Sequence, residues 1–122
     1  MQGNSMSKDI LKKILKNQNH SSKAQKVSLE DLDCTQYHII DVRSPQVFAL
    51  TPHISGALNF ENFEALREFC LAHPDDKILL VCNGGLEAAR VGTQLVDLGL
   101  SNIYFLDEYL QIIQEYLPLD NL

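Results

Sequence analysis

The sequence predicts an α/β domain with a mainly parallel sheet covered by helices on both faces. Three observations predict this class. From residue 27 onward, short apolar runs alternate with segments of helical periodicity, as in parallel strands joined by helices. The 122 residues are enough for one domain with a core of its own. The three cysteines have neither disulfide nor zinc spacing, so we expect packing rather than crosslinks to hold the fold.

Residues 1–26 are predicted to form a basic helix and a linker ahead of the domain at 27–122. The helix is expected over 7–18, where an aliphatic stripe lies opposite a face of lysines. The stripe consists of Ile10, Leu11, Ile14 and Leu15. We expect it to dock on its own domain; a dimer contact, a partner groove or a membrane surface are the alternatives. The polar stretch 17–25 is predicted as a linker.

The first half of the domain is predicted to alternate between short helices and strands. A helix is expected over 29–32 because Ser28 can cap its N-terminus, with Asp31 at capping-box spacing. The three segments that follow are predicted as strand, helix and strand, over 37–42, 44–50 and 57–60.

The second half continues the same alternation with longer elements. A helix over 63–72 turns Phe63, Leu66 and Cys70 inward. The apolar run 77–82 follows a polar turn and predicts a buried strand. Its successor is a helix over 87–98, because apolar residues recur three, four and three positions apart before Gly99. The last two elements are expected at 102–106, a strand, and 108–116, a helix.

The formal net charge of −6 is unevenly distributed along the chain. Residues 1–26 contain six lysines and one aspartate, whereas the rest contain four basic and fifteen acidic side chains. The acidic domain is therefore a poor partner for nucleic acid or anionic membranes.

Targeting signals are not evident in the sequence. No apolar run reaches the length of a membrane span, so no stable membrane insertion is expected. The polar start has no apolar signal-peptide core, and Met6 is a candidate natural start, with residues 1–5 then an added remnant. Reduced thiols and a cytoplasmic location are expected.

Cys82 is the strongest candidate for chemistry. It ends the predicted strand 77–82, and Gly84 and Gly85 separate it from the helix that follows. A cysteine between a strand end and a helix N-terminus faces unpaired N–H groups and the positive end of the helix dipole. Such a site is expected to lower the thiol pKa and to hold a sulfur-centred anion. A buried structural thiol is the alternative.

Other polar residues are predicted at the same edge of the sheet. Asp41, Arg43 and Asp107 follow strands, and ligand sites of parallel sheets lie at the carboxyl ends of the strands. We expect Asp41 to accept hydrogen bonds from local backbone amides and Arg43 to form an ion pair that holds its loop.

The chain resembles the rhodanese-like domain family across about residues 28–116. The matching motifs are Ile40-Asp-Val-Arg-Ser44, His53-Ile-Ser-Gly-Ala57, Leu80-Val-Cys82-Asn-Gly-Gly85 and Gly99-Leu-Ser-Asn-Ile-Tyr-Phe-Leu106. The resemblance implies a three-layer fold with a five-stranded, mainly parallel sheet. It also implies a sulfurtransferase in which Cys82 takes a sulfane sulfur, becomes a persulfide, and passes the sulfur to an acceptor.

The resemblance further implies a loop whose amides cradle the sulfur. The loop residues are Asn83, Gly84, Gly85, Leu86, Glu87 and Ala88. No metal or organic cofactor is implied. The expected partners are a small-molecule or protein persulfide donor and a thiol or protein acceptor.

Two departures from the family pattern add negative charge near the presumed mouth of the site. Many members carry Arg where this chain has Glu87, and a Gly-Gly pair where it has Asp107 and Glu108. A carboxylate near the thiolate raises the thiol pKa, here by about 1–2 kcal/mol of interaction. Thiosulfate is therefore expected to be a poor donor. Phosphatase chemistry is disfavoured, because Ala88 stands where such loops need Arg.

The remaining candidates are expected to be structural. His53 is predicted to orient a turn, and His20, His38 and His73 show no sequence pairing that indicates metal binding or acid–base chemistry. Two rivals to the enzyme remain. One is a non-catalytic rhodanese-like module for binding or regulation. The other is a redox sensor that pairs Cys82 with Cys34 or Cys70, which requires a sulfur within disulfide reach.

Overall fold

A computed structural model describes residues 19–122 of this chain. The helix predicted over 7–18, and with it any docking or dimer contact through that helix, lies outside the described residues. Among the residues described, no helix combines the length and the hydrophobicity needed to cross a bilayer.

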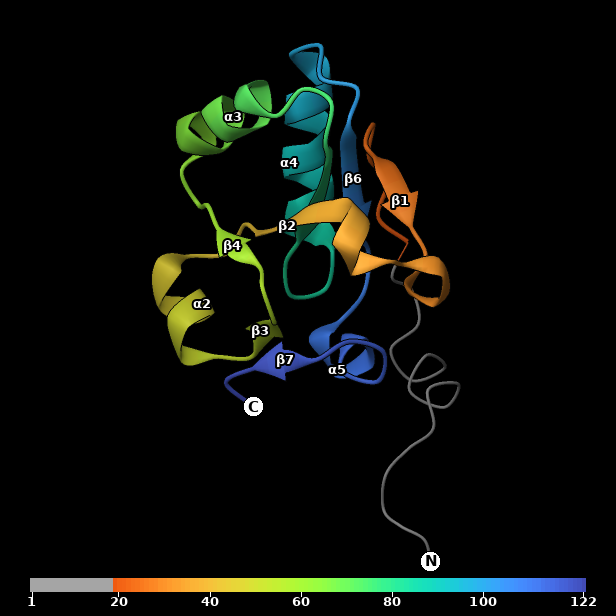
Figure 1. The fold of residues 1–122 in the computed structure, drawn as a ribbon, viewed down its shortest axis with the longest axis vertical. Coiled ribbons are helices and arrows are strands. Elements are labelled where there is room, and N and C mark those ends of the chain that lie inside the picture. The colour runs from red at the N-terminus through yellow and green to blue at the C-terminus, as the bar shows by residue number, and fades with distance from the viewer. Residues whose placement is uncertain (1–18) are drawn as a thin grey trace, which may run out of the picture.

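The centre of the molecule is a five-stranded sheet in the order β1-β6-β5-β2-β4, with every neighbouring pair parallel. The strands are β1 (Gln25–Val27), β2 (Tyr37–Asp41), β4 (Leu58–Asn59), β5 (Lys77–Val81) and β6 (Ile103–Leu106). This arrangement confirms the predicted fold class (Figure 1). Because β5 is the central strand, the loop that follows it begins in the middle of the carboxyl edge.

Two layers of helices cover the sheet, and the alternation of side chains along β5 explains why both faces are apolar. Ile78 and Leu80 pack in one core with α3 (Phe63–Ala72) and α4 (Leu86–Asp97). The core on that face also contains Leu66, Cys70, Ala88, Leu95 and Phe105. Successive residues of a strand point to opposite faces, so a strand buried on both sides is apolar throughout.

The opposite core is built from Leu79 and Val81 together with shorter elements. These elements are the 3-10 helices η1 (Leu29–Asp31) and η2 (Cys34–Gln36) and the helix α5 (Leu110–Ile113). The buried residues include Leu29, Ile54, Leu106, Ile112 and Ile113. The helix predicted over 108–116 is therefore shorter than expected.

A small second sheet was not predicted from the sequence. β3 (His53–Ile54) pairs antiparallel with β7 (Leu119–Asp120), beside α2 (Pro45–Leu50). Two-residue strands of this kind have no alternation long enough to reveal them. Their pairing ties the C-terminal segment to the chain that follows α2 (Figure 1).

The segment predicted as a linker contributes structure where the structure describes it. Gln25–Val27 form the edge strand β1, which crosses the boundary expected between residues 26 and 27. Ahead of it, the Ser22 hydroxyl donates to the Ala89 carbonyl at 2.7 Å, and Ala24 is buried against Gly92 of α4. A Cβ at Gly92 would lie 2.8 Å from that of Ala24, so this close approach depends on glycine.

Candidate active site

The loop after β5 turns back so that backbone N–H groups point at the Cys82 sulfur. Cys82 Sγ accepts hydrogen bonds from the amides of Gly85 and Ala88, at 3.2 and 3.3 Å. Gly84 and Gly85 have φ values of +102° and +94°, which side-chain-bearing residues rarely adopt. The two glycines therefore let the chain reverse direction between the strand and α4.

The Cys82 thiol is nevertheless enclosed, and this reverses one expectation from the sequence. The residue is 4% exposed and belongs to the core beneath α4. Burial raises the pKa of the thiol, and the charge of Asp41 adds to that rise, while the amides of Ala88, Gly85 and Glu87 lower it. The net direction is upward, whereas the sequence predicted a lowered pKa, because desolvation outweighs the hydrogen bonds that favour the thiolate.

Glu87 acts on the sulfur through its backbone rather than its carboxylate. Its N–H favours the thiolate, while its side chain, 46% exposed, pairs with Arg90 one turn further along α4. The carboxylate that raises the thiol pKa belongs to Asp41. The sequence predicted this effect from Glu87 and from the pair Asp107 and Glu108. Leu86, between the glycines and Glu87, is 63% exposed.

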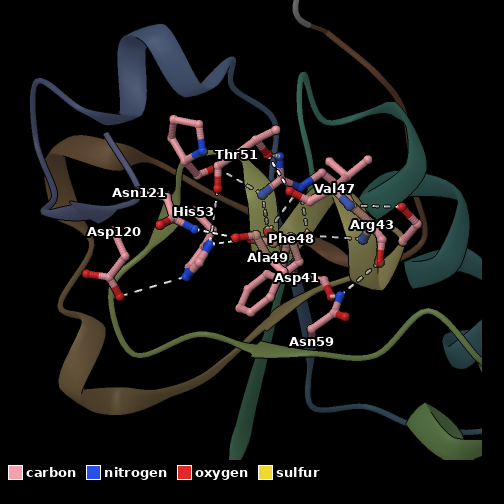
Figure 2. A network of polar contacts seen from close by, with 12 residues as sticks. Asp41, Arg43, Val47, Phe48, Ala49, Thr51, His53, Asn59, Asp120 and Asn121 are labelled. Carbon is pink, nitrogen blue, oxygen red and sulfur yellow. Dashed lines mark hydrogen bonds and ion pairs between the residues drawn. The ribbon is translucent and has the colours of Figure 1, made fainter.

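Asp41 and Arg43 form one rigid unit at the end of β2 (Figure 2). The carboxylate of Asp41, 2% exposed, accepts a hydrogen bond from the Arg43 amide at 3.0 Å and three from its guanidinium group at 2.9, 3.1 and 2.8 Å. Asn59 holds the same loop, since its amide donates to the carbonyls of Asp41 and Arg43. The guanidinium also donates to Thr51 and to the Pro52 carbonyl. The hydrogen bonds of Arg43 thus hold the loop after β2 in place.

His53 holds the turn after α2 (Figure 2). Its Nδ1 lies 2.7 Å from the carbonyl oxygen of Phe48, and its ring stacks on the Phe48 ring with centroids 3.9 Å apart. Its Nε2 is 3.8 Å from a carboxylate oxygen of Asp120 in β7. The residue joins α2 to the second sheet.

Asp107 is ionised beside the loop, but Lys26 compensates its negative charge, which the sequence did not predict. Its carboxylate, 2% exposed, accepts the His20 amide at 2.8 Å, and its oxygens lie 2.8 Å from His20 Nδ1 and 2.9 Å from Lys26 Nζ. Burial acts to raise the pKa of Asp107, but the hydrogen bonds from His20 and Lys26 hold it below its ordinary value. The backbone carbonyl of the next residue, Glu108, accepts a hydrogen bond from the Gly84 amide.

The partners of Asp107 were missed by sequence reasoning. His20 and Lys26 lie in the segment 1–26, predicted as a basic helix and a linker ahead of the domain, more than 80 positions from Asp107. Their polar and basic character resembled that of any solvated linker. The only available signal was the carboxylate itself, at the end of an apolar strand where burial demands a partner.

Two cavities flank the loop, and Arg43 lines both. One, of about 310 Å³, lies between α2 and α5 and reaches Asn83. The other, of about 370 Å³, is lined by polar and apolar groups that include Ser44, Phe60, Glu61, Glu87 and Arg90. Cys82 is not among the residues that line either, which agrees with its burial.

The three cysteines are all free thiols. Cys70 lies in the same core as Cys82, and burial raises its pKa to about 11. Cys34 packs against the core on the opposite face of the sheet. Burial, together with the charge of Asp33, raises the pKa of Cys34.

The histidines are paired in the structure, although the sequence indicated no pairing. His20 meets Asp107, and His38 lies beside His73 with ring centroids 4.7 Å apart. His38 and His73 come from β2 and from the turn before β5, which the parallel pairing of these strands brings together.

The protein is therefore a three-layer α/β domain in which backbone amides surround a cysteine at the carboxyl end of the central strand. The family model for the rhodanese-like domain matches residues 8–111. The chain therefore belongs to the rhodanese-like domain family, and the resemblance stated from its motifs is confirmed.

Curated relatives include single-domain sulfurtransferases. The thiosulfate sulfurtransferase GlpE of Pseudomonas paraeruginosa is 28% identical over 82 residues, which cover 67% of this chain and 74% of the relative. GlpE of Pseudomonas fluorescens is 33% identical over 69 residues, covering 57% and 62%. These relatives place the chain in a family of sulfurtransferases.

Solved structures are similar to most of this chain. Protein hp1203 of Helicobacter pylori has a TM-score of 0.69 and 25% identity, covering 77% of this chain and 86% of that chain. A rhodanese-related protein of Thermoplasma volcanium has a TM-score of 0.63 and 25% identity, covering 80% and 99%.

Proposed function

We propose that this protein transfers a sulfane sulfur from a donor to a thiophilic acceptor through a persulfide on Cys82. The observation that carries the proposal is the pair of amide hydrogen bonds from Gly85 and Ala88 to Cys82 Sγ. Backbone N–H groups fixed around a sulfur favour its anionic form over its neutral form. A thiol held only for packing has no need of them.

The reaction consists of two displacements. In the first, the Cys82 thiolate attacks the outer sulfur of the donor; a sulfur–sulfur bond forms on Cys82 as the bond between that sulfur and the donor breaks. The donor leaves with the electron pair of the broken bond. In the second, the acceptor attacks the terminal sulfur, and Cys82 leaves as a thiolate. The same amides stabilise the Cys82 thiolate before the first step and after the second, and the thiol proton passes to solvent.

The charges around the cavities favour a protein persulfide or an uncharged donor over thiosulfate. Arg43 and Arg90 line the 370 Å³ cavity, but they are paired with the carboxylates of Asp41 and Glu87. Glu61 lines the same cavity. A small dianion entering there meets neutralised arginines rather than a positive pocket. A thiol or a protein thiol is the acceptor that fits this chemistry.

The test is persulfide formation on the intact chain. We expect incubation with 2-hydroxyethyl persulfide, a donor that carries no carboxylate, to add one sulfur by intact mass, and cyanide to remove it. The adduct is expected to vanish in Cys82→Ala and to persist in Cys34→Ala, the matched control. Transfer should fall by at least about a thousandfold in Cys82→Ala, the magnitude expected for losing a nucleophile. With thiosulfate, the adduct should form more slowly.

The absence of an adduct on Cys82 with any donor would contradict the proposal. That result would favour a module for binding or regulation, for which the enclosure of Cys82, at 4% exposure, is the supporting observation. An adduct that survives in Cys82→Ala would move the chemistry to another thiol and contradict the assignment equally.

A further inference from the structure

A second cluster of reactive side chains lies at the amino edge of the sheet, opposite the cysteine loop. His38, near the start of β2, meets His73 and Asp76 from the turn that leads into β5. One ligand atom from each, an imidazole nitrogen or a carboxylate oxygen, lies within 4.8 Å of the others. His38 Nε2 and Asp76 Oδ2 are 2.9 Å apart. The cluster follows from strand register, since His38 is paired with Ile78 of β5.

The ring of His73 is oriented for coordination. Its Nδ1 lies 2.8 Å from the carbonyl oxygen of Phe69. A carbonyl only accepts, so Nδ1 carries the proton and Nε2 presents a lone pair. Phe69 also stacks on His73, with centroids 4.3 Å apart, and contacts the edge of the His38 ring at 5.4 Å. A backbone carbonyl on the second nitrogen is the usual support of a metal-binding histidine.

The turn that carries two of the three side chains is held in place. Asn102, just ahead of β6, donates from its side-chain amide to the carbonyls of His73 and Asp76, at 3.1 and 2.6 Å. This bridge fixes the turn against the neighbouring strand. Ligand positions that do not have to be ordered on binding lower the entropic cost of holding an ion.

The cluster is open to solvent. The side chain of His38 is 36% exposed and that of Asp76 is 53% exposed. A cavity of about 480 Å³, lined also by Asp75 and Lys77, adjoins these two residues. An ion can therefore reach the cluster without opening the core.

We propose that His38, His73 and Asp76 bind a divalent transition-metal ion of the zinc class. Two imidazoles and one carboxylate form a ligand set that zinc accepts, with a fourth position left for water. Binding takes the His38 tautomer whose proton is on Nδ1, so that Nε2 faces the ion in place of its hydrogen bond to Asp76. The ion then joins β2 to the turn before β5.

The proposal is independent of sulfur transfer. Asp76 and Cys82 lie at the two ends of β5, six residue steps apart along an extended strand, so the cluster is roughly 20 Å from the cysteine loop. Zinc binding is therefore expected to survive in Cys82→Ser, whatever the outcome of the persulfide experiment.

The experiment is a calorimetric titration of the untagged full chain with Zn²⁺, followed by the same titration with Mg²⁺. We expect one equivalent of Zn²⁺ and no binding of Mg²⁺, which prefers an all-oxygen octahedral site. The Tm should rise with Zn²⁺ concentration, by about 4 °C or more at saturating ion, because the ion binds only the folded turn.

Variants locate the ion. His38→Gln and His73→Gln should each weaken Zn²⁺ binding by at least about tenfold. His53→Gln is the matched control, because His53 also has Nδ1 at a carbonyl and its ring stacked on a phenylalanine, yet it belongs to no cluster of metal-ligand side chains among residues 19–122. Cys34→Ser removes the one thiol of the three that is not buried and should leave the affinity unchanged.

Spectroscopy provides a readout that does not depend on stability. Co²⁺ bound by imidazole and carboxylate lacks the intense ultraviolet charge-transfer band of thiolate coordination. In NMR spectra, the imidazole nitrogen resonances of His38 and His73 should shift when Zn²⁺ is added, whereas those of His53 should not. The proposal would be overturned if His38→Gln and His73→Gln both bound Zn²⁺ as tightly as the wild type. A thiolate band with Co²⁺, or no Zn²⁺ binding by the wild type, would overturn it equally.

Discussion

The two edges of the sheet hold polar groups in opposite ways. At the carboxyl edge, Cys82, Asp41 and Asp107 are each less than 5% exposed, and backbone amides donate to all three. At the amino edge, His38 and Asp76 are partly or largely exposed and partner each other through side chains. Both edges belong to the same strands, so strand register alone does not account for the contrast.

This contrast indicates which edge of the sheet should tolerate amino-acid substitutions. Buried polar groups need every partner they have, because an unsatisfied group away from water costs the full desolvation free energy. Exposed groups exchange a lost partner for water. The carboxyl edge should therefore be intolerant of substitution, whereas the amino edge should be tolerant in the absence of a bound ion.

The sharpest comparison uses the glycines at the two ends of α4. Gly85, at the carboxyl edge, has a φ of +94°, and a Cβ there would lie 2.8 Å from the Asp107 Cα and collide with its carboxylate. Gly99, after the helix, has a φ of +96° with open space around it. Gly85→Ala should lower the free energy of unfolding by about 3–4 kcal/mol, from strain plus overpacking, and Gly99→Ala by about 1 kcal/mol.

Urea unfolding of both glycine variants measures the difference, and sulfur transfer should fall only in Gly85→Ala. Equal destabilisation by the two substitutions would mean that backbone conformation alone decides, and that the contact with Asp107 contributes nothing.

A smaller effect is expected at Asp107 and Asp76, two of the carboxylates that meet histidines. Asp107→Asn should lower the free energy of unfolding by about 2 kcal/mol, because buried charge-assisted hydrogen bonds from His20 and Lys26 are weakened. Asp76→Asn removes a solvent-exposed partner of His38 and should change the free energy of unfolding by about 0.5 kcal/mol or less. Chemical denaturation at neutral pH checks both values, and a larger loss for Asp76→Asn would invert the comparison.

The pH dependence of stability follows from the direction of the Asp107 pKa. Because folding lowers that pKa, the carboxylate stabilises the folded state above its unfolded pKa, and the contribution is lost as pH falls through the folded value. The stability difference between the wild type and Asp107→Asn should thus shrink below about pH 4. A difference that grows on acidification would contradict the assigned direction.

The smallest expected effect concerns the reactivity of Cys82 itself. Because burial raises the pKa of its thiol, the thiolate fraction should increase about tenfold per pH unit through the alkaline range. Site-resolved iodoacetamide labelling should rise in the same way, beyond the pH at which glutathione levels off. A plateau near neutral pH would show that the amides of Gly85 and Ala88 outweigh burial after all.

Much of the fold and part of the site could be predicted from the sequence. The helix predicted over 63–72 matches α3 in its bounds, and the strand predicted over 77–82 matches β5 to within one residue. Apolar periodicity reports these elements because long, regular segments bury a whole face. The edge strand β1 was missed, since three residues with two exposed side chains resemble a linker.

What the sequence determined by itself is the cysteine loop: a strand end, two glycines and a helix start are contiguous, so local backbone preference is enough to turn the amides toward Cys82. Only the tertiary structure decided how that thiol is solvated, which partners neutralise Asp107, and which histidines meet at the far edge. These properties depend on burial and on contacts between segments distant in the chain, which local preferences do not encode.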